Sequence, residues 1–487
     1  MLALVLLMLV LGFFVYRATG RPRNFPPGPL NLPVVGYLPF LGQQIHHQMA
    51  KLSEKYGDIF GLNFGSYRVV MLNSLSAIRD AFREEMFSGR PDFLFFRLLS
   101  DNNKGVVFSE GQTWHDMRRF THRNLRDFGL GKSTLQVLIL DEIVELMAAL
   151  EANAGTPISL SSRLNLAVVN ALWTIINGKR FAQDDPLAVQ AAENISRMIA
   201  SLSSGSPVDL LPFLMHLSPW KNSVDDRLKY LVPVKELVMR AVRDHQEVHR
   251  DGDESDLIHA FVERINNSQQ SDPTFSGTAG ILNLKNVVLD LFIAGTETTT
   301  TSLLWLILLL ASHPEIQEKV QREIDTHVPR DTLPTMEHRP KLNYTEAAIK
   351  ESMRFSSSVP LGMFHAAIAD ADLRGYTIPK GTILFANLHK IHHSPEHWTK
   401  PEEFYPEHFL DEDGHLTNPE AFIPFSAGKR ICLGESLARM QLFLFTAALF
   451  QKFTFKFPGD RDPPSLVPDG GTSLTPRPFE VIVKLRN

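Results

Sequence analysis

The chain has 487 residues, of which 44% are hydrophobic and 21% charged, and its formal net charge is −5. This composition is ordinary for a globular protein, and a chain of this length can bury a core large enough to enclose a cavity. The single cysteine excludes an intramolecular disulfide and fits a reducing compartment, while the mild negative charge gives no reason to expect nucleic acid as a partner.

The N-terminal residues 1–16 carry no charge, and Arg17 follows them. As a helix this run would span roughly 24 Å, slightly less than the ~30 Å hydrocarbon core of a bilayer. A cleaved signal peptide is the alternative, but no basic region precedes the run and no A-x-A cleavage site ends it. Positive charge after the run favours an uncleaved anchor at 1–18 that leaves the rest of the chain on the cytoplasmic side.

Residues 19–39 are rich in proline and glycine, and prolines cannot continue a helix. They predict a stiff hinge between the anchor and a single body formed by residues 40–487. In that body, apolar runs at 59–64 and 67–72 flank a Gly-Ser step, which predicts a β-hairpin. Helical periodicity then dominates to about residue 324, so we expect a mainly α fold with a minor β portion.

The longest helical pattern runs from about 284 to 312 and stops before Pro314. It is apolar on nearly every side, which is typical of a helix buried in a large core. A second membrane span is the alternative, but Asp290 and Glu297 interrupt the run. The polar residues 266–280 before this helix predict a surface loop.

The C-terminal part is rich in loops until a second apolar helix, which we expect from Glu435 to Lys452. The segment FSAGKRICLG, residues 425–434, precedes this helix and contains Cys432. A cysteine just before a helix feels the positive end of the helix dipole and free N–H groups, which lower a thiol pKa. A buried, inert cysteine is the alternative. The glycines of the loop let the backbone approach a flat ligand, which favours a ligand role for the thiolate.

This loop resembles the haem-binding loop of the cytochrome P450 superfamily, F-x-x-G-x-R-x-C-x-G, at Phe425, Gly428, Arg430, Cys432 and Gly434. The resemblance covers nearly the whole chain and is closest to animal microsomal family-2-like members, arthropod ones among them. It implies a helix-rich, triangular body around a buried haem b. It also implies that Cys432 is the axial ligand of the iron, where a thiolate favours O–O cleavage, and that Arg430 contacts a haem propionate.

The sequence AGTETT at 294–299 lies within the long predicted helix, where a glycine followed by hydroxyl residues can loosen the helical hydrogen bonds. Taken alone, a threonine-rich face packed in the core explains this segment equally well. The resemblance implies an oxygen-activation segment, in which Thr298 and Glu297 deliver protons through water. Ala294 and Gly295 would then line the oxygen pocket.

Glu351 and Arg354 are three residues apart, a spacing that stabilises an exposed helix by only a few tenths of a kcal/mol. The resemblance implies that they are the structural E-x-x-R pair of the family. The third member of that group normally comes from a P-E-R-F loop, which here reads PEHF at 406–409. His408 in place of arginine removes a bidentate guanidinium contact, and we interpret it as a feature of the subgroup.

Further contacts to haem propionates are implied by the resemblance alone. It assigns them to Trp114 and Arg118, which share a helix face at a spacing of four residues, and to Arg90 and His365. It also implies that a basic cluster is the docking surface for an acidic electron-donor flavoprotein. The alternative is that this cluster is simply a solvated face. Its residues are Arg118, Arg119, Arg123, Arg126 and Lys132.

These features predict a monooxygenase on the cytoplasmic face of the endoplasmic reticulum that hydroxylates or epoxidises a lipophilic xenobiotic, fatty acid, terpenoid or steroid. Because no G-x-G-x-x-G follows a predicted strand, we expect NADPH electrons from NADPH–cytochrome P450 reductase, with cytochrome b5 as a further donor. A second membrane contact is expected at Phe213–Met215 and Trp220. The expected substrate pocket is apolar, with walls from Val106, Val107, Phe108, Phe292, Ile293, Ala294, Val359, Leu361, Met363 and Leu474.

Two other classes of protein compete with this hypothesis. An oxygen-independent haem-thiolate isomerase or dehydratase can dispense with the acid–alcohol pair Glu297-Thr298, and a non-catalytic haem-binding membrane protein needs no docking surface. Four histidines have a spacing that mimics that of metal ligands: His389, His392, His393 and His397. Their context, HHSPEHW, resembles an ordinary family loop, so no zinc site is expected there.

Overall fold

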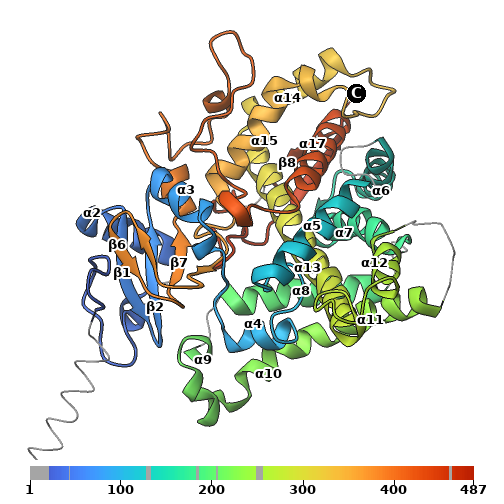
Figure 1. Cartoon of the computed structure of the whole chain (residues 1–487). Helices are drawn as coiled ribbons and strands as arrows, with labels where there is room; N and C mark the ends of the chain where they lie inside the picture. The colour runs from blue at the N-terminus through green and yellow to red at the C-terminus, as the bar shows by residue number, and fades with distance from the viewer. Residues whose placement is uncertain are drawn as a thin grey trace, which may run out of the picture.

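The computed structural model describes residues 21–42, 44–127, 133–181, 186–203, 207–247, 256–459 and 463–486. The predicted anchor at 1–18 and Lys132 of the basic cluster lie outside the described residues. Helices make up most of the body, and the sheets are gathered mainly at one side of it (Figure 1). The predicted mainly α fold with a minor β portion is therefore confirmed.

A four-stranded sheet has the strand order β1-β2-β7-β4. Strands β1 (Ile59–Phe64) and β2 (Tyr67–Leu72) form the predicted antiparallel hairpin, and β2 pairs in parallel with β7 (Ile383–Ala386). Strand β4 (His365–Ala366) pairs with the other edge of β7. The parallel pairing joins segments that lie more than 300 residues apart, so this sheet connects the N-terminal and C-terminal parts of the chain.

Two smaller sheets complete the β portion. One has the order β3-β9-β8, and the other is a two-stranded ribbon. The strands of these two sheets are β3 (Pro157–Ile158), β8 (Phe453–Lys456) and β9 (Val481–Leu485) in the first, and β5 (Ala371–Leu373) and β6 (Tyr376–Ile378) in the second.

The α-helices surround a central helix, and many of them lie on the side of the body away from the four-stranded sheet (Figure 1). In chain order they are α2 (Ile45–Tyr56), α3 (Leu75–Arg83), α4 (Leu94–Leu99), α5 (Gly111–Asp127), α6 (Ser133–Glu151), α7 (Ser161–Asn177), α8 (Pro186–Ser203), α9 (Pro207–Leu210), α10 (Ser223–Leu228), α11 (Val232–Glu247), α12 (Leu257–Asn266), α13 (Gly277–Ser312), α14 (Pro314–His327), α15 (Asn343–Ser356), α16 (Leu388–His392) and α17 (Glu435–Lys452).

Helix α13 is the central element, and it packs against α7, α11, α12, α15 and α17. It ends before Pro314 as predicted, but it begins at Gly277, so the last residues of the predicted 266–280 loop are helical. These residues are two glycines, Thr278 and Ala279, and they carry no apolar pattern that would reveal the helical period. Among the described residues α13 alone is long and apolar enough to cross a membrane, yet 61% of its apolar window is buried inside the body. The prediction of a buried core helix is confirmed.

Helix α17 has the predicted bounds, and nearly all of its residues are buried. It packs on α13, α14 and α15, so the segment after Cys432 runs straight into the core. The expected second membrane contact is only partly exposed. Phe213 is 48% exposed in a 3-10 helix (Pro212–His216), whereas Leu214, Met215 and Trp220 pack partly buried against the core.

Candidate active site

Cys432 lies in the loop between a 3-10 helix (Gly428–Arg430) and α17. Its backbone N–H donates to the carbonyl oxygen of Phe425 at 3.1 Å, which closes the loop on itself. Gly428 has a φ of +74°, and a Cβ there would lie 2.0 Å from the carbonyl oxygen of Phe82 on α3. Only glycine therefore allows the loop to pack directly on α3.

The thiol of Cys432 is accessible, although protein surrounds it closely enough for burial to raise its pKa. The backbone N–H groups of Gly434 and Glu435, at the start of α17, donate to the sulfur and oppose that rise. The predicted lowering of the pKa by the helix start is thus present but smaller than the effect of burial. A thiol that is accessible although protein surrounds it closely faces a space inside the protein. A metal ion there would reverse the balance, because coordination deprotonates a thiol.

Three arginines from different segments gather around this loop. Arg430 is 7% exposed, donates to the carbonyl oxygens of Ser88 at 2.8 Å and Ser109 at 2.6 Å, and lies 3.8 Å from the centre of the Trp114 ring. Arg90 donates to the carbonyl oxygens of Val107 and Phe364. Arg118 donates to the carbonyl oxygen of Ile431 at 2.6 Å. In the described part of the chain, these guanidinium groups donate hydrogen bonds to neutral carbonyl oxygens, and nearby carboxylates such as Glu110 act on them through their charge.

Burial has the largest effect on the pKa values of two of these arginines. Burial, together with the charge of Arg90, lowers the pKa of Arg430 to about 8. Burial also lowers the pKa of Arg90 to about 10, against the attraction of Glu110. Buried cations without a carboxylate partner are costly unless an anion from outside the chain joins them. The cluster therefore suits a ligand with a strongly anionic edge.

The indole of Trp114 supplies a second sign of a missing partner. Its Nε1–H is buried and has no hydrogen-bond acceptor in the described part of the chain, whereas buried polar groups are normally bonded. His365 lies close by, stacked on Phe82 at 3.7 Å, with its Nδ1 bonded to the carbonyl oxygen of Phe87 at 2.8 Å. A thiol, three guanidinium groups and an unpaired indole N–H are the donor set that a haem with two propionates requires.

The segment at 294–299 lies in the middle of α13. Ala294 and Thr298 are exposed there, four residues apart and hence on one face of an otherwise buried helix. The hydroxyl of Thr298 donates to the carbonyl oxygen of Ala294 at 2.6 Å. The helix continues through this segment as an α-helix, without the predicted loosening. Gly295 instead faces α7, where a Cβ would lie 2.4 Å from Leu172 Cδ2, so it serves helix packing.

Glu297 is largely buried, and burial raises the pKa of its carboxyl group. The hydroxyl of Ser196, on α8, donates to this carboxylate at 2.7 Å and opposes the rise. Nothing in the sequence indicates this contact, because the two residues are 101 positions apart. The raised pKa allows Glu297 to hold a proton closer to neutral pH than an exposed glutamate does.

The expected pocket walls divide into two groups. Val107, Ile293, Val359 and Met363 are partly accessible, whereas the other walls apart from Ala294 are buried. Phe292 is fully buried and packs edge-on against Trp173 of α7 at 5.2 Å, on the side of α13 away from Ala294 and Thr298. The buried walls are Val106, Phe108, Phe292, Leu361 and Leu474.

Aromatic rings missed in the sequence extend this apolar region. Phe96 on α4 lies 4.7 Å from Phe108 and 5.8 Å from Phe364, measured between ring centres. Phe364 in turn lies 5.0 Å from Phe385 of β7. The run of phenylalanines near residue 95 is the only sequence signal for this cluster, and it does not reveal which rings meet.

Asp290 has a role that its sequence position did not suggest. Its carboxylate accepts the backbone N–H groups of Val106 at 2.8 Å and Val107 at 2.9 Å. A Cβ on Gly105 would lie 2.5 Å from this carboxylate, so the loop comes close to α13 only because residue 105 is glycine. Burial raises the pKa of Asp290 to about 7, although the two N–H groups and the charge of Arg90 act against it. Asp290 thus fixes two pocket walls on α13.

The pair Glu351 and Arg354 is fully buried on α15. Arg354 Nε and Nη2 both donate to the Glu351 carboxylate at 2.7 Å, and the remaining N–H groups donate to carbonyl oxygens. His408 joins the pair through Nδ1, at 3.2 Å from both carboxylate oxygens. Its Nε2 accepts the N–H of Lys400 at 3.2 Å, so Nδ1 carries the proton and donates. The histidine replaces the missing arginine as a donor to Glu351.

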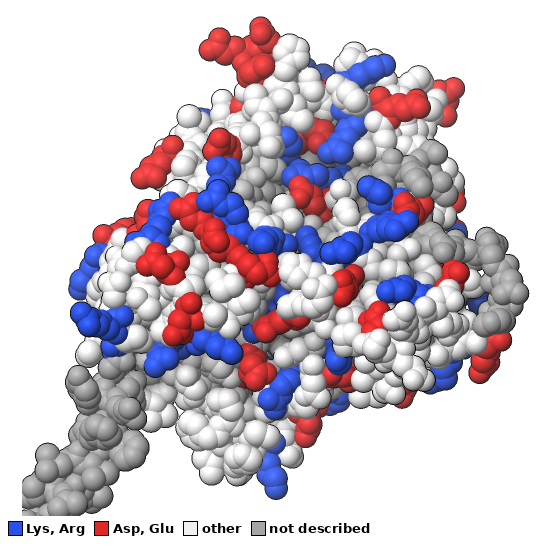
Figure 2. All heavy atoms as spheres, in the orientation of Figure 1, with Lys and Arg blue, Asp and Glu red and all other residues white. Residues whose placement is uncertain are grey.

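The basic cluster on α5 is split by the structure. Arg118 turns toward the cysteine loop, whereas Arg119, Arg123 and Arg126 are exposed, and Arg123 lies 3.7 Å from Asp127. Figure 2 shows lysine and arginine side chains in a band across this face of the body, with acidic groups beside them. The band crosses the part of the molecule where Figure 1 places α5.

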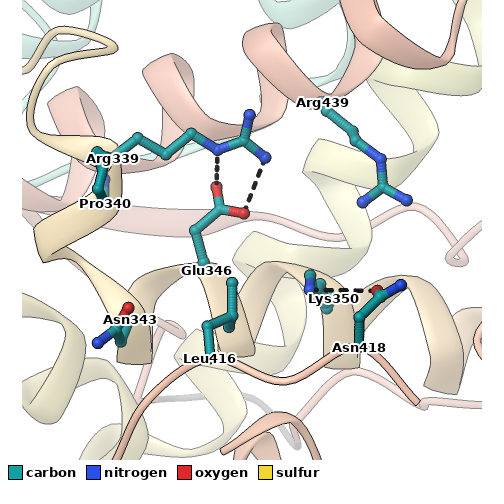
Figure 3. A pocket seen from close by; sticks show the side chains of 8 residues that line it. All are labelled: Arg339, Pro340, Asn343, Glu346, Lys350, Leu416, Asn418 and Arg439. Carbon is teal, nitrogen blue, oxygen red and sulfur yellow. Dashed lines mark hydrogen bonds and ion pairs between the residues drawn. The ribbon is translucent and has the colours of Figure 1, made fainter.

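A separate polar pocket of about 440 Å³ lies beside α15 and α17 (Figure 3). Arg339 crosses it and donates twice to Glu346 at 2.9 Å. None of the residues predicted for the active site lines this pocket, whose walls are Arg339, Pro340, Asn343, Glu346, Lys350, Leu416, Asn418 and Arg439.

Comparison with known proteins agrees with this geometry. A family model described as Cytochrome P450 matches residues 26–483. The chain belongs to the cytochrome P450 family. It is 37% identical to cytochrome P450 2L1 of Panulirus argus, with 97% of each chain covered. It is 36% identical to farnesoate epoxidase of Bombyx mori, over 100% of this chain and 99% of that one, and 36% identical to cytochrome P450 2D15 of Canis lupus familiaris, over 99% and 97%.

The relatives bear out the predicted resemblance to family-2 members, with arthropod proteins among them. The protein is therefore a cytochrome P450 monooxygenase that uses a haem iron. This conclusion disfavours the non-catalytic alternative. It does not depend on any one of the side-chain contacts described above.

Proposed function

We propose that this P450 hydroxylates or epoxidises a lipophilic small molecule with NADPH electrons from a partner reductase. The observation that carries the proposal is the donor set around Cys432, which among the described residues consists of an accessible thiol, guanidinium groups bonded to carbonyl oxygens, and a buried indole N–H without an acceptor. These groups match the iron and the anionic edge of haem b.

In this proposal Cys432 binds the iron of haem b, and Arg90, Trp114, Arg118, His365 and Arg430 hold its propionates. Phe425, Gly428 and Gly434 shape the loop, which packs on α3 through Gly428. The bound haem supplies the activation of dioxygen, favoured by the thiolate ligand. The protein positions the substrate, delivers protons and excludes bulk water.

Proton delivery is assigned to Glu297 and Thr298. The Glu297 carboxyl group is buried and has a raised pKa, which allows it to hold a proton at a higher pH than an exposed glutamate does. Thr298 presents its side chain on the accessible face of α13, next to Ala294. Ser196 holds the carboxyl group of Glu297 through a 2.7 Å hydrogen bond and is a positioning residue in this relay.

An apolar substrate is supported by the walls around the accessible face of α13. Val107, Ile293, Val359 and Met363 offer aliphatic surface, and the Phe96–Phe108–Phe364 cluster adds aromatic surface. One relative is named farnesoate epoxidase. That name supports including unsaturated isoprenoid compounds, along with fatty acids, steroids and drugs, in a screen of binding by haem spectral shifts.

We also propose that electrons arrive from NADPH–cytochrome P450 reductase, or from cytochrome b5, at the face that carries Arg119, Arg123 and Arg126. Exposed positive charge of this kind raises the rate of encounter with acidic partners. The proposed location is the cytoplasmic face of the endoplasmic reticulum, with an anchor at 1–18, a hinge at 19–39 and the catalytic domain at 40–487. Exposed Phe213 supports an additional contact with the membrane surface.

The proposed proton relay is tested by Thr298→Ala in the purified protein with added reductase and a substrate from the screen. Removing the hydroxyl should lower product formed per NADPH several-fold and raise hydrogen peroxide release by a matching amount. Thr296→Ala is the matched control, because Thr296 makes the same bond to the carbonyl four residues earlier, at 2.6 Å, but is fully buried. Equal coupling in the two variants would reject the role of Thr298.

A further inference from the structure

Three histidine rings meet where α2 packs against α16. The ring centres of His46 and His47, both on α2, lie 4.5 Å and 4.6 Å from that of His389 on α16. One ring nitrogen from each of the three histidines can be chosen so that all three lie within 4.8 Å of one another. The two segments are more than 300 residues apart in the sequence, so only the fold brings these rings together.

His46 is the unusual member of this cluster. It is 1% exposed, and neither of its ring nitrogens has a hydrogen-bond partner in the described part of the chain. Buried polar atoms are nearly always bonded, and an unpaired one costs about 1–3 kcal/mol. If the rings only filled space, a phenylalanine at this position would do so without that cost. Two unpaired nitrogens in a fully buried ring therefore indicate a ligand.

The surroundings hold the two segments together without using those nitrogens. Asn387, just before α16, donates to the carbonyl oxygen of His46 at 3.3 Å and to Asn73 at 3.1 Å. Lys390 on α16 donates to Ser53 on α2 at 2.6 Å. The backbones of α2 and α16 are thus fixed relative to each other, while the ring nitrogens of His46 stay without partners.

The chemistry of the cluster suits a metal ion of the zinc type. Burial lowers the pKa of His46 to about 3 and that of His389 well below its usual value, so these rings are neutral near pH 7. Neutral imidazole nitrogens are preferred ligands of zinc, copper and nickel ions. His47 is exposed, which gives an ion a path from solvent, and the negative charge of Glu402 acts on it.

We propose that His46, His47 and His389 form a binding site for a divalent ion of the zinc type that ties α2 to α16, separate from the haem. A tetrahedral site with zinc–nitrogen bonds of about 2.0–2.1 Å places its ligand nitrogens about 3.4 Å apart. The rings therefore need to close by about 1.5 Å or less. Three histidine ligands leave a fourth position for water.

The structure also shows that the four histidines at 389–397 do not form a metal site by themselves. His392 uses both ring nitrogens, at 2.8 Å from the Ser357 hydroxyl and 3.2 Å from the backbone N–H of Ile423. His397 is exposed and lies outside the cluster. His393 stacks on His389 at 4.0 Å, with its Nδ1 on the carbonyl oxygen of His389. From that run the cluster takes His389, and its other two ligands come from α2.

The test uses the full-length holoprotein, freed of metal by a chelator and then titrated with zinc chloride. Zinc-edge X-ray absorption separates this ion from the haem iron. We expect one zinc per chain with a shell of imidazole nitrogens at about 2.0–2.1 Å. His46→Phe and His47→Ala should each lower the zinc affinity at least about tenfold, measured by competition with a chromophoric chelator.

His397→Ala is the control and should bind zinc like the wild type. The reduced carbon-monoxide spectrum of each variant shows whether the haem site is intact, and His47→Ala, being exposed, provides a test even if His46→Phe does not fold. The proposal is overturned if the wild type binds no zinc, if the zinc shell lacks imidazole nitrogens, or if His47→Ala binds zinc as tightly as His397→Ala.

Discussion

Two buried arginines in this protein are held in opposite ways. Arg354 is 0% exposed and has its charge balanced by Glu351 through two bonds of 2.7 Å. Arg430 is 7% exposed, but its guanidinium group donates to carbonyl oxygens and faces the charge of Arg90. The first group is complete within the chain. The second has no carboxylate bonded to its guanidinium group in the described part of the chain, which is what the proposed haem site predicts.

The difference teaches how to separate structural from functional buried charge. A structural pair satisfies its own hydrogen bonds, because removing two ions from water is costly unless their geometry is good. A binding cluster keeps donors unpaired, as Trp114 Nε1 is among the described residues. The unpaired donor destabilises the protein without its ligand, and the bound ligand removes that cost. Four substitutions test this distinction, from the largest expected effect to the smallest.

Glu351→Ala should have the largest effect, because it leaves the Arg354 charge buried without a counter-charge. We expect the free energy of unfolding to fall by about 3–5 kcal/mol, measured by denaturant unfolding, with a low yield of folded protein. Arg374→Ala is the control, since Arg374 forms an exposed pair with Asp80 at 2.7 Å and should cost less than about 1 kcal/mol. Equal losses would show that the buried pair is no stronger than a surface one.

Arg430→Leu should instead spare folding and weaken haem binding. Removing one partner of a buried charged contact costs about 2–5 kcal/mol, so haem should pass to an excess of an acceptor protein much faster and more completely than from the wild type. Far-ultraviolet circular dichroism should remain that of a folded protein. Arg119→Leu, an exposed change on α5, is the control. Loss of folding in place of loss of haem would place Arg430 in the same class as Arg354.

Asp290 is a buried carboxylate that accepts two backbone N–H groups, and its raised pKa should make the free energy of unfolding depend on pH. Its pKa is raised from 3.8 to about 7, so between these values the folded protein holds a proton that the unfolded chain has released. The stability that this proton provides is complete below the lower value and is lost as pH rises toward the upper one. Relative to Asp290→Asn, which cannot titrate, the wild type should lose roughly 3–4 kcal/mol over this window, because one pH unit corresponds to about 1.4 kcal/mol. Parallel curves of unfolding free energy against pH would contradict the shifted pKa.

Trp114→Phe should have the smallest effect. It keeps the aromatic face over Arg430 but removes the unpaired N–H. Without haem the variant should be as stable as the wild type or slightly more so, and with haem it should lose about 1 kcal/mol of binding free energy. Haem transfer to an acceptor protein measures the second quantity. A stability loss in the haem-free protein would mean that the indole N–H already has a partner within the chain.

The sequence predicted those features that depend on residues close together in the chain. The β-hairpin at 59–72, the end of α13 before Pro314 and the full extent of α17 all follow from local periodicity and turn residues. The pairing of Glu351 with Arg354 follows from a spacing of three residues on a helix. Cys432 and the loop glycines lie within ten consecutive residues, 425–434, directly before α17, and on this pattern the sequence proposed the cysteine as a ligand.

Contacts between distant segments could not be predicted in this way. Ser196 meets Glu297 across 101 residues, and Asp290 meets the loop at Val106 and Val107 across more than 180. Gly295 packs close to Leu172 of α7, a contact that its place in the AGTETT segment did not indicate. Each of these contacts depends on how two elements pack against each other, and local sequence patterns do not specify that packing.

The sequence by itself therefore indicated the family and the kind of chemistry, because these depend on short, contiguous motifs. The tertiary structure alone decided the partners: which arginines crowd around Cys432, which hydroxyl holds Glu297, and which histidines meet at α2 and α16. The physical reason is range. Covalent neighbours are fixed by the chain, whereas charge balance and unpaired donors are properties of the packed interior.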